Sequence, residues 1–161
     1  MGIFSWLFGE GRNELYKREP VKPKTKRIKI EDDKVFEICI VGESHYQDEL
    51  EEICGGYTEK GHNLQIEAKL IYEDDNEYDD NAISIEIDGN TIGYLSREDA
   101  KLYREKMKEL GYIGNTVGCQ AIIRGGWDDG NGDRGHFGVK LYLPKTFYWG
   151  SGKWVSIENM Q

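Results

Sequence analysis

Apolar and polar residues alternate along several stretches of this 161-residue chain, which is the pattern of β-strands with one buried face. The clearest stretch is residues 82–95, AISIEIDGNTIGYL, where three isoleucines alternate with polar residues that begin with Ser84. Its centre, Asp88-Gly89-Asn90, supplies residues that tolerate the positive φ angles of a tight hairpin turn. Further strands are expected at residues 34–42, 63–73, 115–126 and 136–144.

Two other segments carry the periodicity and the end signals of short helices. In residues 43–56, Ser44 is followed three positions later by a glutamine, which is the spacing of a capping box, and Gly55 is placed to end the helix. In residues 96–111, Ser96 is the expected N-cap of a helix with one apolar stripe.

These segments predict a mainly β (α+β) protein with about six strands and two short helices. Because hairpins outnumber βαβ units, we expect an antiparallel sheet that curls into a small barrel. We assign residues 34–145 to this barrel. Residues 1–33 form an N-terminal extension with an aromatic start, IFSWLF, and many basic residues, and residues 146–161 form an aromatic-rich C-terminal tail.

The charge of the chain is unevenly distributed. The formal net charge is −9, yet residues 1–30 carry +5, so the remainder carries −14. An acidic body repels a phosphate backbone over most of its surface, so non-specific sliding along duplex DNA is not expected. Three scattered cysteines, and the lack of an apolar run of the roughly 20 residues that a membrane helix needs, indicate a cytoplasmic protein.

The candidate chemistry centres on residues 73–83, EDDNEYDDNAI, where carboxylates surround one tyrosine. The stretch lacks the ligand spacing of an EF-hand loop, and the cysteines and histidines form no close-spaced pair, so neither a metal nor another cofactor is predicted. A glycine-rich run at residues 130–135 precedes a strand and not a helix, which indicates a hairpin loop. No nucleophile motif is visible, so we expect no catalytic activity.

Three short motifs together resemble the signature of the HIRAN domain. They are the strand end Val41-Gly42, the turn NEYDDNAI at residues 76–83, and Ile92-Gly93-Tyr94-Leu95 before the second helix. The resemblance spans roughly residues 35–143. HIRAN domains occur as free-standing bacterial proteins and fused to DNA-dependent ATPases that remodel stalled replication forks. The resemblance implies an OB-like barrel that binds the 3′-hydroxyl end of single-stranded DNA, a role in DNA repair and a DNA-dependent ATPase as a partner.

The resemblance also assigns roles to individual residues. The tyrosine and aspartate of the family turn stack on the terminal base and hold the terminal sugar hydroxyl, and these roles fall to Tyr78 and Asp79, with Asn76 as a neighbouring polar contact. Arg97 falls just after the Ile-Gly-Tyr-Leu motif, at a position that is held by a basic residue in DNA-binding members of the family. Where DNA-binding members have an Arg-Tyr pair, this chain has Ser44-His45, and that departure removes a strong phosphate partner. The candidate DNA-binding residues are Ser44, His45, Tyr46, Asn76, Tyr78, Asp79, Tyr94, Arg97 and, as the aromatic that closes the pocket, Trp127 or Phe137.

Other interpretations stay open at this point. Asn81 is also suited to capping the turn with its side chain, and Arg97 to a solvated position in the first helical turn. The barrel is also compatible with an adaptor that has lost DNA affinity and contacts a protein or a membrane surface through residues 1–33. A third hypothesis is a metal-dependent phosphodiester hydrolase that uses Asp74, Asp75 and Asp79.

Overall fold

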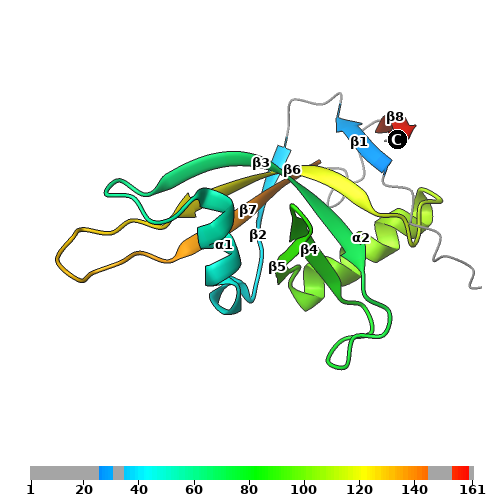
Figure 1. The fold of residues 1–161 in the computed structure, drawn as a ribbon. Coiled ribbons are helices and arrows are strands. Elements are labelled where there is room, and N and C mark those ends of the chain that lie inside the picture. The colour runs from blue at the N-terminus through cyan, green and yellow to red at the C-terminus, as the bar shows by residue number, and fades with distance from the viewer. Residues whose placement is uncertain (1–25, 31–34, 145–153, 160–161) are drawn as a thin grey trace, which may run out of the picture.

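Six antiparallel strands form a curled sheet in the order β2-β7-β6-β3-β4-β5 (Figure 1). This computed structural model describes residues 26–30, 35–144 and 154–159. The curled sheet and its two α-helices confirm the predicted mainly β fold with an OB-like sheet. The six strands are β2 (Val35–Cys39), β3 (His62–Tyr72), β4 (Ile83–Ile87), β5 (Asn90–Tyr94), β6 (Val117–Gly125) and β7 (Phe137–Pro144).

Two further strands extend the sheet to eight. Strand β1 (Lys26–Ile30) pairs in parallel with the start of β6 and in antiparallel orientation with β8 (Trp154–Asn159). Neither strand was predicted from the sequence. The aromatic start IFSWLF, considered as a membrane or protein contact, lies outside the described residues.

The β4–β5 hairpin forms as predicted. Asp88 and Gly89 make a two-residue turn with φ angles of 51° and 85°, and both values suit the mirror-image turns that join twisted strands. Ser84, which alternates with the isoleucines of β4, is buried as well, since only 3% of the residue is exposed. Ser84 is paired on one side with Ile71 of β3 and on the other with Tyr94 of β5, so strands flank it on both sides.

The second predicted helix begins as expected. Helix α2 (Arg97–Glu109) is capped by Ser96, whose side-chain oxygen accepts a hydrogen bond from the Asp99 amide at 3.1 Å. Its apolar stripe, Ala100, Tyr103 and Met107, is buried in the core. Helix α2 therefore has a fixed position against the sheet (Figure 1).

The first helix begins later than predicted. Ser44 lies in a single 3₁₀ turn, η1 (Glu43–His45), and makes no side-chain cap, so the capping-box prediction is wrong. Helix α1 (Gln47–Cys54) starts after Tyr46. The Gln47 carboxamide instead donates to the Phe137 carbonyl at 3.0 Å and accepts from the Phe137 amide at 2.8 Å. The side chain that should have completed the cap therefore joins α1 to β7.

The two ends of the six-strand path meet at one bridge, which we call the seam. The amide of Val41, just past β2, donates to the Tyr94 carbonyl at 2.8 Å, and the Tyr94 amide donates back to the Val41 carbonyl at 2.9 Å. Gly93 permits this approach, because a Cβ there would lie 2.8 Å from the Val41 carbonyl oxygen and 2.7 Å from Cδ1 of Ile40. The seam thus explains why Val41-Gly42 and Ile92-Gly93-Tyr94-Leu95 belong to one structural unit.

Candidate nucleic-acid interface

A pocket of about 350 Å³ opens beside the seam. This volume lies in the lower part of the range of roughly 300–1,000 Å³ that is usual for small-molecule sites. Three segments build the pocket: the chain after β2, the acidic loop (residues 73–82) and the junction of β5 with α2. The residues that line it are Val41, Gly42, Tyr46, Asn76, Tyr78, Asp79, Ala82, Tyr94, Leu95 and Arg97.

Asn76 organises the acidic loop from within. Its side-chain oxygen accepts hydrogen bonds from the amides of Tyr78 at 2.9 Å and Asp79 at 3.1 Å, and its side-chain nitrogen donates to the Glu73 carboxylate at 2.9 Å. Such side-chain-to-backbone bonds stabilise a turn in the way that backbone bonds do. Asp79 adds a second bond of this kind, from the Asn81 amide at 2.9 Å. Asn76 and Asp79 therefore perform the turn-capping that the sequence suggested for Asn81.

Tyr78 is strongly exposed for an aromatic residue, with 82% of its surface accessible. Large aromatic rings are usually mostly covered in folded proteins. Its carbonyl oxygen accepts a hydrogen bond from Nη2 of Arg97 at 3.2 Å, which links the loop tip to the start of α2. Tyr78 thus lines the pocket with a strongly exposed side chain, and the Arg97 guanidinium group lies against its backbone.

Tyr94, another residue that lines the pocket, carries a neutral hydroxyl. This hydroxyl donates to Oε1 of Glu73 at 3.4 Å. Burial, followed by the neighbouring Tyr46 hydroxyl and the Glu73 carboxylate, raises the pKa of Tyr94 above its ordinary value. Tyr94 therefore keeps its proton at physiological pH.

Arg104, which was not predicted from the sequence, holds the base of the acidic loop. Its guanidinium group donates to the carbonyls of Asn81 at 2.8 Å and Ala82 at 3.0 Å, and pairs with Asp74 at 2.7 Å. It also lies 4.5 Å from the centre of the Tyr72 ring. One signal was available in the sequence, because Arg104 follows Arg97 by seven residues and so projects from the same side of the helix two turns later.

The structure brings together six of the ten candidate residues at the pocket. Ser44 and His45 are exposed in η1, between the lining residues Gly42 and Tyr46, but do not line the pocket themselves. The six that line the pocket are Tyr46, Asn76, Tyr78, Asp79, Tyr94 and Arg97.

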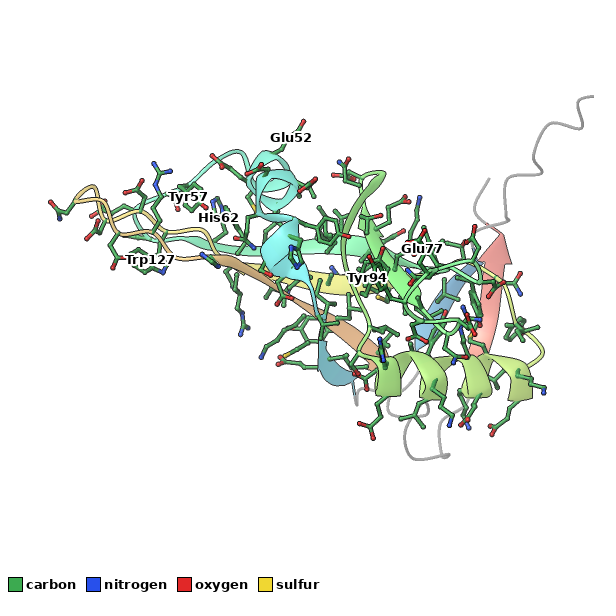
Figure 2. The ribbon with its side chains drawn as sticks, turned by 90° about the horizontal axis from the view of Figure 1, so that it is seen from below. Glu52, Tyr57, His62, Glu77, Tyr94 and Trp127 are labelled. Atoms are coloured by element: carbon green, nitrogen blue, oxygen red, sulfur yellow. The ribbon has the colours of Figure 1, made fainter. Side chains whose placement is uncertain are left out.

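Neither candidate for the closing aromatic lies at the pocket. Phe137 is only 1% exposed and packs against Tyr57 with ring centres 5.0 Å apart, so the prediction that it contacts a ligand is wrong. Trp127, just after β6, is bridged to Thr58, just before β3. Figure 2 shows Trp127 at the same end of the molecule as Tyr57 and His62, whereas Tyr94 lies within the body.

The pocket is acidic on the loop side and has Arg97 as its basic lining residue. Among the described residues, no group of three or more His, Cys, Asp or Glu side chains is arranged to hold a metal ion. No helix in the described ranges has both the length and the apolar character to cross a membrane.

The residues that line the pocket combine an exposed aromatic ring, a carboxylate and a guanidinium group. Together these groups suit a planar ring that bears hydroxyl and phosphate groups.

The fold and the pocket define a small β-domain with a site of ligand size in the part of the chain that the structure describes. No family model matches the chain, and no curated protein does. Among solved structures, the chain is similar to the crystal structure of the HIRAN domain of human HLTF, with 18% sequence identity and a TM-score of 0.35 over 70% of this chain and 78% of that chain. A likeness this distant carries no argument about the site.

Proposed function

We propose that this protein is a non-catalytic module that binds the 3′-hydroxyl end of single-stranded DNA in the pocket beside the seam. The observation that carries the proposal is the exposed Tyr78 side chain in the lining of a pocket that also contains Asp79 and Arg97. An aromatic ring that stacks on a base contributes roughly 1–3 kcal/mol to binding. The resemblance of residues 76–83 and 92–95 to the HIRAN signature supports the same function.

Each group has a distinct role in this proposal. Tyr78 stacks on the last base, and Asp79 accepts a hydrogen bond from the terminal 3′-hydroxyl. The same carboxylate repels a 3′-phosphate, so a finished end is preferred over a phosphorylated one. Arg97 binds the phosphate that precedes the last nucleotide, and its place at the start of α2 adds the favourable end of the helix dipole.

Fluorescence anisotropy tests the proposal with a short oligonucleotide that ends in a 3′-hydroxyl and the same strand with a 3′-phosphate. We expect tighter binding of the hydroxyl end. Tyr78→Ala should weaken that binding roughly 5- to 150-fold, which corresponds to the loss of one stacking contact. Trp127→Ala is the matched control, because Trp127 is also partly exposed, at 36%, but lies away from the pocket. Equal affinity for the two ends, or full binding by Tyr78→Ala, would reject the proposal.

A further inference from the structure

The acidic loop concentrates like charges that oppose its compact shape. Within residues 73–80, every residue except Asn76 and Tyr78 is a carboxylate. Like charges at such short spacing repel one another, so a loop of this composition needs external contacts to keep one conformation. In the described part of the chain, the contacts from outside the loop include two arginines of one helix, Arg97 and Arg104.

Arg104 contacts both ends of the loop at once. Asp74 lies near its beginning, at 2.7 Å from Nη1, whereas the carbonyls of Asn81 and Ala82 lie at its end, at 2.8 Å from Nε and 3.0 Å from Nη2. A guanidinium group can make these bonds together because its five N–H donors have a fixed planar arrangement. Stacking of this group on Tyr72 leaves its edge free for the three bonds.

The closed base of the loop is connected to its tip through Asn76. This side chain joins the Glu73 carboxylate to the amides of Tyr78 and Asp79. Arg97 lies about 10 Å from Arg104 along the helix, as seven residues at 1.5 Å per residue require, and it holds the Tyr78 carbonyl. Helix α2 therefore supports the loop at its base and at its tip.

We propose that Arg104 is a positioning residue, which orders the acidic loop so that Tyr78 and Asp79 are in their binding arrangement before a ligand arrives. The part of this inference that concerns ligand affinity rests on the proposed function. A loop that must be ordered during binding lowers affinity, because the loss of conformational entropy offsets part of the favourable interaction energy. Arg104 thus raises affinity without touching the nucleotide.

Amide hydrogen exchange of Tyr78 and Asp79, followed by NMR in the ligand-free 161-residue chain, tests the ordering directly. Arg104→Gln should speed exchange of these two amides about tenfold relative to amides of β6, and should weaken binding of the 3′-hydroxyl oligonucleotide by about the same factor. Arg104→Lys should not restore either property, because an ammonium group does not match three acceptors held in one plane.

Arg134→Gln is the matched control. Arg134 has contacts of the same kind, with Asp128 at 2.7 Å and the Tyr57 ring centre at 4.8 Å, but does not line the pocket. This variant should leave the Tyr78 and Asp79 amides and the affinity unchanged. If Arg104→Gln fails to fold, Asp74→Asn removes the ionic partner at an exposed position and should also speed the two amides.

The outcomes separate the two proposals. Unchanged exchange of Tyr78 and Asp79 in folded Arg104→Gln, or in Asp74→Asn where the first variant does not fold, would overturn the positioning role. Equal acceleration in Arg134→Gln would overturn it as well. Faster exchange in a protein that binds neither oligonucleotide would support the ordering of the loop by Arg104 and reject the proposed function.

Discussion

Replacing Gly93 by alanine tests whether the seam holds the barrel closed. The new methyl group would lie 2.8 Å from the Val41 carbonyl oxygen and 2.7 Å from Cδ1 of Ile40. The isoleucine side chain can rotate away, but the carbonyl belongs to the bridge itself and can move only if the bridge opens. The backbone of Gly93, with a φ angle of 152°, is also one that alanine rarely adopts.

The expected cost of this replacement follows from two contributions. Overpacking in a tight core typically costs about 1–3 kcal/mol, and a positive φ angle costs a residue other than glycine roughly 1–2 kcal/mol. The free energy of unfolding should therefore fall by roughly 2–5 kcal/mol. With a urea dependence of about 2 kcal/mol per molar, the middle of the range for a small domain, the midpoint of unfolding should fall by roughly 1–2.5 M.

Urea denaturation followed by tryptophan fluorescence and circular dichroism measures this change, and Gly89→Ala separates the two contributions. Gly89 lies in the same hairpin and has a φ angle of 85°, but a Cβ there would meet nothing within 4 Å. Gly89→Ala should therefore lower stability only by the backbone contribution, roughly 1–2 kcal/mol. If Gly93→Ala is no less stable than Gly89→Ala, close contact at the seam does not limit the residue at position 93.

Two further predictions concern α2 and the thiols. Ser96→Ala should lower the free energy of unfolding by about 1 kcal/mol in thermal denaturation, because it removes the acceptor of the Asp99 amide, and an unchanged midpoint would show that this cap contributes little. Burial raises the pKa of the Cys119 thiol to about 12, and the thiolate is the form of cysteine that reacts. A thiol reagent at pH 8 should therefore modify the exposed Cys39 much faster than Cys119. Mass spectrometry of the modified peptides measures both rates, and equal rates would contradict the raised pKa of the partly buried Cys119 thiol.

Local signals in the sequence were sufficient where the structure is decided locally. Asp88-Gly89 forms its turn because the two residues tolerate positive φ angles, and Ser96 caps α2 through a residue three positions away. Ser44 carries an equally good local signal but does not cap a helix. The reason is distant in sequence, because the Gln47 side chain bonds to Phe137, 90 residues later.

The site shows the same difference between residues that local sequence signals identify and residues whose role depends on contacts distant in the sequence. The motifs identified the residues at the pocket wall, such as Tyr78 and Arg97, because these belong to short continuous patterns. Arg104 was missed because its hydrogen-bond partners lie 22 to 30 positions earlier in the chain. Phe137 was misassigned because an aromatic residue after a glycine-rich loop has no local signal that decides between core and surface, and packing against Tyr57 decides it.

The position of the pocket at the seam couples occupancy to the stability of the whole domain. Val41 and Tyr94 come from opposite ends of the strand order, and both line the pocket. A molecule bound there contacts both ends and stabilises only the closed sheet, because the unfolded chain has no such site. By mass action, a ligand at 100 times its dissociation constant would add about 2.7 kcal/mol to the free energy of unfolding. A rise in melting temperature can therefore report occupancy for any compound, whatever its chemical class.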